Sequence, residues 1–157
     1  MKKYLIVFLI SMVPLIELRG AIPYAVGFSL PIVPSYIVAV IGNMLPVPFI
    51  FLFARRLLEW GKDKKYIGRF FSWCLEKGEK GGRKLEAKAS HGLYIALLLF
   101  VGIPLPGTGA WTGTLAASLL NLSFKKSIVA VMAGVVLAGV IMLLASLGVF
   151  GAISLAK

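Results

Sequence analysis

The sequence predicts an all-α integral membrane protein built from two repeats of opposite topology. The 157-residue chain is 59% hydrophobic and has a mean hydropathy of +0.93. A folded core of this length cannot withdraw so much apolar surface from water, so a bilayer must act as the solvent. Charges gather in one central stretch, and each half shows the same order of apolar runs and breaks. We therefore expect one membrane domain, 1–157, with repeat 1 at 1–58 and repeat 2 at 91–157.

The formal net charge of +11 arises mainly between positions 55 and 88. This stretch holds 11 of the 17 Lys and Arg residues and five of the six acids. A basic protein can bind nucleic acid, but a single basic loop fits the positive-inside rule better, so we expect no nucleic-acid partner. Residues 59–90 are predicted to form a cytoplasmic connector. Apolar residues between Lys62 and Lys77 recur at helical spacing, which indicates a basic amphipathic helix on the membrane surface.

The first half begins with an apolar run, 4–13, that is too short to cross a membrane alone, because spanning takes about 20 helical residues. Residues 14–23 interrupt it, and apolar sequence resumes at 24–30. We expect a re-entrant hairpin of two half-helices over 4–31. The first full span follows at 32–58, with kinks at Pro46 and Pro48 and a cytoplasmic anchor of two arginines.

The second half repeats this order. A hairpin is expected over 91–122, with a break at 104–114, and a second full span over 127–155 after Lys125 and Lys126. The segment IVAV at 37–40 recurs at 128–131, and Pro-Leu at 14 recurs at 104. These matches and the shared order of elements indicate an internal repeat.

A cytoplasmic connector would make the two spans run in opposite directions, which is the arrangement of inverted repeats. Lys2 and Lys3 favour an alternative in which the N-terminus is cytoplasmic and residues 4–30 span; we prefer the hairpin. We expect a multi-pass protein of the inner (cytoplasmic) membrane with lipids as neighbours. Two spans and two hairpins enclose little space, so a homo-oligomer, most simply a dimer, is expected.

Glu17 and Arg19 are the charges that lie within apolar sequence outside the basic loop. Each costs about 2.5–3.5 kcal/mol at the bilayer centre on insertion scales. In one interpretation they satisfy each other or cap the half-helices. In the other, the Arg19 fork binds a phosphate or carboxylate and Glu17 couples binding to a proton.

The uncharged second break offers backbone N–H groups and hydroxyls, and its glycines permit close approach to a ligand or tight helix packing. Trp111 is expected to pack or to cover an apolar chain, and Asn43 to line the cavity or pack between helices. The predicted substrate and coupling site comprises Glu17, Arg19, Gly20, Pro23, Asn43, Pro104, Pro106, Gly107, Thr108, Gly109, Trp111 and Thr112.

Cofactor and metal chemistry are not expected. One cysteine cannot form an internal disulfide, and one histidine with few carboxylates near it cannot build a metal site. The same scarcity of catalytic groups at membrane depth disfavours a membrane enzyme.

The stretches PLIELRGAIP at 14–23, GNMLPVP at 42–48 and PLPGTGAWTG at 104–113 resemble the putative small multidrug export family over nearly the whole chain. That family is similar, more distantly, to the DedA membrane proteins. The DedA resemblance implies two re-entrant hairpins packed tip to tip, movement of polyprenyl-phosphate lipids, and a charged tip at Glu17 and Arg19. DedA proteins carry functional charges in both halves, whereas the second break here has none.

Three functions follow as hypotheses. The first is a transporter or flippase for an amphipathic anionic lipid such as a polyprenyl phosphate, bound at Arg19 and coupled to protons or ions through Glu17. The second is a small multidrug exporter in which Glu17 exchanges a lipophilic cation for protons. The third is a non-transporting membrane scaffold.

Overall fold

The structure, a computed structural model, describes residues 2–14, 16–63, 68, 69, 72, 76, 92–105 and 107–155. The elements in this part of the chain are helices, and no strand occurs among them. The all-α prediction is therefore confirmed for the described residues. The predicted amphipathic helix and the rest of the connector fall almost entirely outside them.

Two apolar helical segments are long enough to cross a membrane. The first, Ile32–Gly61, joins α3 (Ile32–Met44) to α4 (Pro46–Gly61), and the second is the Phe124–Ala152 part of α7 (Phe124–Leu155). They coincide with the two predicted spans. The regular helix is interrupted at Leu45, directly before Pro46. Pro46 has no N–H to donate to the carbonyl of Gly42, which explains the position of the interruption.

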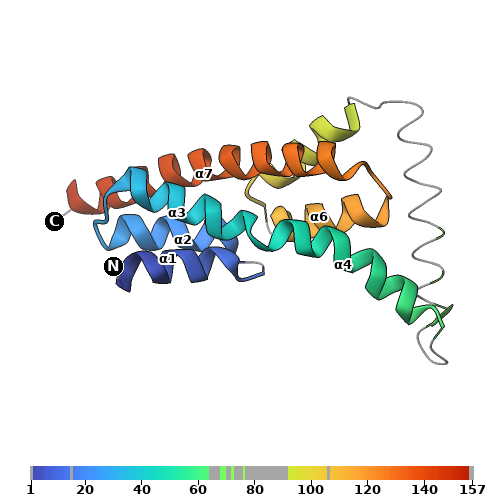
Figure 1. Cartoon of the computed structure of the whole chain (residues 1–157). Helices are drawn as coiled ribbons and strands as arrows, with labels where there is room; N and C mark the ends of the chain where they lie inside the picture. The colour runs from blue at the N-terminus through green and yellow to red at the C-terminus, as the bar shows by residue number, and fades with distance from the viewer. Residues whose placement is uncertain are drawn as a thin grey trace.

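The shorter helices form two pairs. They are α1 (Lys2–Met12) with α2 (Glu17–Gly27), and a helix at Gly92–Gly102 with α6 (Ala110–Leu119). In Figure 1, α2 lies beside the C-terminal half of α7, with α1 on the far side of α2, and the second pair lies at the N-terminal half of α7. The segments between the helices of each pair, the first break (13–16) and the second break (103–109), thus lie near the middle of the bundle.

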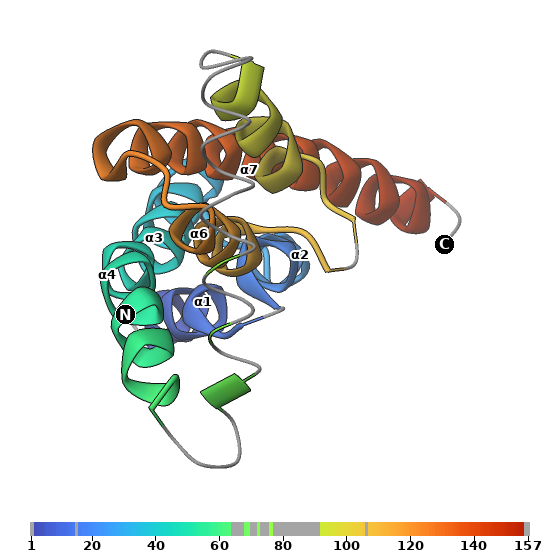
Figure 2. The same ribbon diagram turned by 90° about the vertical axis from the view of Figure 1, so that its right-hand side faces the viewer.

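The helices α2 and α6 occupy the centre of the bundle. Each of them contacts α7, and they also pack against α1 and α4, respectively. Figure 2 shows α7 lying across one face with α2 and α6 beneath it. The residues that begin α2 and α6 are therefore enclosed by helices from both halves of the chain.

Small residues allow the helices to approach closely, while large apolar residues cover the outside. A Cβ at Gly42 would lie 2.7 Å from the backbone oxygen of Phe8, so α1 and α3 meet where only glycine fits. Close contact at small residues is the usual way in which helices pack in membranes. The outward residues Val33 and Leu144 are 68% and 66% exposed, as expected where lipid replaces water.

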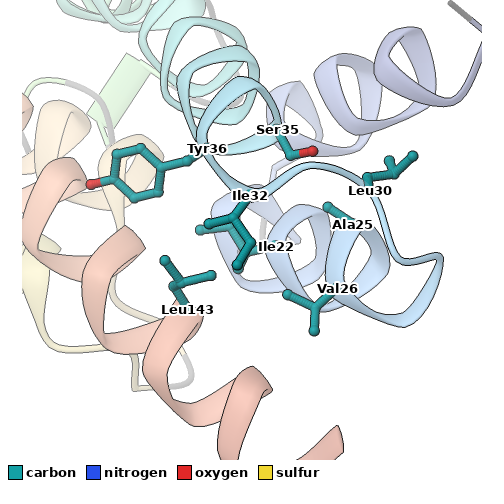
Figure 3. A pocket seen from close by; sticks show the side chains of 8 residues that line it. All are labelled: Ile22, Ala25, Val26, Leu30, Ile32, Ser35, Tyr36 and Leu143. Atoms are coloured by element: carbon teal, nitrogen blue, oxygen red, sulfur yellow. The ribbon is translucent and has the colours of Figure 1, made fainter.

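A small cavity marks the junction of α2, α3 and α7 (Figure 3). Its volume is about 10 Å³, which is no more than the space of one water molecule. The cavity is lined by residues that include Ile22, Ile32 and Leu143. Tyr36 also lines it, and its hydroxyl donates a hydrogen bond of 2.7 Å to the Val136 carbonyl on α7. We interpret this cavity as a packing defect rather than a ligand site.

Both breaks are shorter than the sequence predicts. The helix α2 begins at Glu17, so Gly20 and Pro23 lie inside it rather than in the break. Likewise α6 begins at Ala110 and includes Trp111 and Thr112. Pro23 leaves the carbonyl of Arg19 without its helical donor, yet α2 continues because packed neighbours tolerate proline within membrane helices.

Candidate functional site

Glu17, at the end of the first break, forms hydrogen bonds with backbone groups that directly follow the second break. It is the first residue of α2, and its side chain is only 5% exposed. Its Oε2 accepts a hydrogen bond of 3.2 Å from the N–H of Ala110, and its Oε1 accepts one of 2.9 Å from the N–H of Trp111. Both donors belong to the first turn of α6, where backbone N–H groups have no helical acceptor and the helix dipole is positive. The carboxylate therefore caps a helix more than 90 residues away in sequence.

Gly109 provides the space for this contact. Its φ of +134° lies in a region that side chains with a Cβ rarely adopt. A Cβ at this position would lie 2.3 Å from Oε2 of Glu17. The Gly109 residue precedes α6 without a side chain to cap it, and the Glu17 carboxylate supplies the missing cap.

Arg19 holds the turn that precedes α6. Its Nη2 donates a hydrogen bond of 2.7 Å to Oγ1 of Thr108, and its Nη1 donates to the carbonyl of Leu105. The Thr108 hydroxyl also lies 2.9 Å from the Ile103 carbonyl, so it links the guanidinium to the end of the preceding helix. The fork shape of the guanidinium suits these two acceptors.

The two charges act on the second break, and in the described residues no ion pair joins Glu17 to Arg19. One interpretation of the sequence is that these charges cap the ends of the half-helices. The contacts of Glu17 agree with it, except that the capped helix, α6, belongs to the other half of the chain. A binding role for the pair stays a prediction.

A cavity of about 290 Å³ is lined in part by Glu17. Its walls come from the first break, α4, the second break and α6: Pro14, Glu17, Ile50, Thr108, Trp111, Thr112 and Leu115. We call it the Glu17 cavity. Apart from Glu17, the two threonines and Trp111, the lining residues are apolar, and Nε1 of the Trp111 indole has no hydrogen-bond partner among the described residues. Such a cavity can hold an apolar molecule that carries a positive charge.

The structure brings five of the predicted residues together at this cavity. Glu17, Thr108, Trp111 and Thr112 line it, and Arg19 binds Thr108 from outside it. Three further predicted residues belong to the second break. Pro104 lies within it, Gly107 turns the chain with a φ of +82°, and Gly109 lies against the Glu17 carboxylate.

Three predicted residues lie elsewhere. Gly20 faces Ile16 and Ile10, where a Cβ would lie 2.4 Å from the Ile16 methyl, so its role there is packing. Pro23 is one turn further along α2. Asn43 is 1% exposed, does not line the Glu17 cavity, and its Oδ1 accepts no hydrogen bond from the described residues. Pro106 lies outside the described residues.

Sequence reasoning missed the apolar walls and the backbone partners. Leu115 follows Trp111 by four residues, and this spacing places both on one face of a helix, so the pattern contained a usable signal. Ile50 has no such signal, because it is one of many aliphatic residues in an apolar span. The carbonyl of Leu105 and the N–H of Ala110 belong to the backbone, which no motif identifies.

Comparison with known proteins adds one finding. A family model described as putative small multi-drug export protein matches residues 17–141. The match begins at Glu17 and includes the second break, α4 and α6. No curated protein and no solved structure matches the chain. The more distant resemblance to DedA proteins is not shown by these comparisons.

Proposed function

Because the chain belongs to the putative small multi-drug export protein family, we propose that it is a membrane transporter that exports lipophilic cations in exchange for protons. We further propose that the cation and the proton compete for Glu17. The observation that carries the proposal is the composition of the Glu17 cavity, in which a carboxylate lies among apolar walls and an indole ring.

The contacts of Arg19 reduce its conflict with a cationic substrate. A guanidinium two residues from the carboxylate would repel a cation if both charges faced the same cavity. Arg19 instead donates to the Leu105 carbonyl and the Thr108 hydroxyl, and it does not line the Glu17 cavity. The volume of about 290 Å³ lies near the lower end of the range for small-molecule sites.

Protonation of Glu17 offers a means of coupling. The charged carboxylate binds the N-terminus of α6, and a neutral acid would bind it less strongly. Release of the cation by protonation would thus loosen the contact between the two breaks. In this proposal the two inverted repeats then rock against each other and expose the cavity to the other side of the membrane.

The proposed topology places the Lys125 end of α7 in the cytoplasm, with Lys2 and Lys3 outside. Lys125 and Lys126 are exposed at the start of α7, at the same end of the bundle as the end of α4 (Figure 1). The positive-inside rule supports this orientation through the basic stretch that follows α4. Each pair of short helices would then be a re-entrant hairpin, within a multi-pass protein of the inner membrane, and a dimer remains part of the proposal.

Transport in proteoliposomes tests the proposal directly. The native chain should accumulate tetraphenylphosphonium, a lipophilic cation, when a pH gradient is imposed. Glu17→Gln keeps the shape of the side chain and removes its charge, so it should abolish gradient-driven uptake. Glu59→Gln, a matched change at an exposed carboxylate near the end of α4, should leave uptake unchanged. Equal uptake by the native chain and Glu17→Gln, with both shown to be folded, would refute the proposal.

An amphipathic anion, such as a polyprenyl phosphate, is the second candidate substrate. In the described residues Arg19 donates only to neutral acceptors, and a phosphate would form stronger charge-assisted bonds with it. Flipping of a fluorescent polyprenyl phosphate in the same vesicles separates the two candidates. Loss of flipping in Arg19→Gln, with uptake of tetraphenylphosphonium absent in the native chain, would favour the anion.

A further inference from the structure

A groove runs along the outside of the bundle between the helix Gly92–Gly102 and the first half of α7. Its volume is about 530 Å³, larger than that of the Glu17 cavity, with which it shares no lining residue. Its floor and sides include Ile95, Leu98, Val129 and Ala133, and Lys125 and Lys126 lie at one end. We call it the lysine groove.

The apolar part of the groove suits a hydrocarbon chain. Ile95 and Val129 are 57% and 61% exposed, so they offer surface that the fold does not cover with other described residues. Lipid wets every apolar surface of a membrane protein, and exposure alone indicates no site. The lysine groove differs because it is concave and carries two cations at one end.

The charged end of the groove is fixed by contacts between its two walls. The N–H of Ser123 donates a hydrogen bond of 3.2 Å to the Tyr94 hydroxyl, and Nζ of Lys126 lies 5.6 Å from the centre of the Tyr94 ring. Among the described residues that line the groove, two are cationic and none is acidic. The first turn of α7 adds to this positive charge through the helix dipole.

The order of these features matches one class of ligand. The lysines begin a membrane span, where side chains reach the lipid headgroups, and the apolar walls follow them along the span. We propose that the lysine groove binds an anionic phospholipid, with its phosphate at Lys125 and Lys126 and an acyl chain along Ile95, Leu98 and Val129. The quaternary amine of a zwitterionic phosphatidylcholine would oppose the two lysines, so the anionic lipid should bind more tightly.

Native mass spectrometry of the full chain in detergent tests this binding. Dioleoyl phosphatidylglycerol and dioleoyl phosphatidylcholine would be titrated separately, and the lipid retained by the protein measured. We expect phosphatidylglycerol to be retained in preference. One lysine near a membrane surface contributes about 1 kcal/mol toward anionic lipid, so Lys125→Gln with Lys126→Gln should weaken binding by about 30-fold at most.

Two further variants separate the groove from general electrostatics. Ala133→Phe fills the groove without changing charge and should weaken retention of phosphatidylglycerol. The double variant Lys2→Gln with Lys3→Gln removes the same charge at the opposite end and should leave retention unchanged. The proposal would be overturned if the protein retained the two lipids equally. It would also be overturned if both double lysine variants lost phosphatidylglycerol to the same extent, or if Ala133→Phe retained it fully. Circular dichroism melting would first show that each variant is folded.

Discussion

At the scale of single residues, the close contact between Gly109 and Glu17 is the most restrictive feature of the site. The backbone of Gly109 has a left-handed φ, and the carboxylate fills the space that a Cβ would need. Two independent constraints thus act on one position. A residue that has either constraint alone should tolerate alanine better.

Gly109→Ala is expected to lower the free energy of unfolding by about 2–4 kcal/mol, because strain in φ adds to the overlap with Oε2 of Glu17. Gly107→Ala, which has a φ of +82° but no neighbour within 4 Å, should cost about 1–2 kcal/mol. Gly148→Ala is the control, since it lies in α7 with open space around it. Unfolding in mixed micelles measures all three. A Gly109→Ala protein as stable as Gly148→Ala would show that neither the φ nor the Glu17 contact restricts position 109.

At the scale of elements, the contact between α2 and the second break depends on the pair formed by Arg19 and Thr108. Three hydrogen-bonding groups, the guanidinium, the hydroxyl and the Leu105 carbonyl, meet there. Because these groups belong to different halves of the chain, their contact is the best measure of whether the breaks are coupled.

A double-mutant cycle with Arg19→Gln and Thr108→Val should give a coupling energy of about 0.5–3 kcal/mol in unfolding experiments. The same cycle with Thr112→Val serves as the control, because that hydroxyl donates a long bond of 3.4 Å to the Gly109 carbonyl and does not contact Arg19. Its coupling energy to Arg19→Gln should be below about 0.5 kcal/mol. Equal coupling in both cycles would mean that Arg19 does not act through Thr108.

At the scale of the whole molecule, the structure places the start of α1 and the start of α7 at opposite ends of the bundle (Figure 1). This arrangement bears on the two topologies that the sequence left open. If the long helices cross the membrane, Lys3 and Lys125 must face opposite sides.

Labelling of single cysteines at Lys3 and Lys125, in a chain with Cys74→Ser, decides between the topologies. A membrane-impermeant maleimide added to intact cells should label the cysteine at position 3 from outside. It should reach position 125 only after the cells are opened, because the positive-inside rule places the lysine pair in the cytoplasm. Labelling of both positions from the same side would exclude the proposed inverted arrangement.

The all-helical class, the two long apolar segments, the family and the presence of a break between short helices in each half could all be predicted from the sequence. Hydrophobicity, helix-breaking residues and isolated charges are local properties, so they can be recognised directly in the amino-acid sequence. Where the breaks end, and which groups Glu17 and Arg19 contact, follows from the folded arrangement. Their partners are backbone groups of Leu105, Ala110 and Trp111 and the hydroxyl of Thr108, which lie 86–94 residues away. Backbone donors and acceptors are alike at every residue, so only the packing of the helices selects which of them meets a given charge.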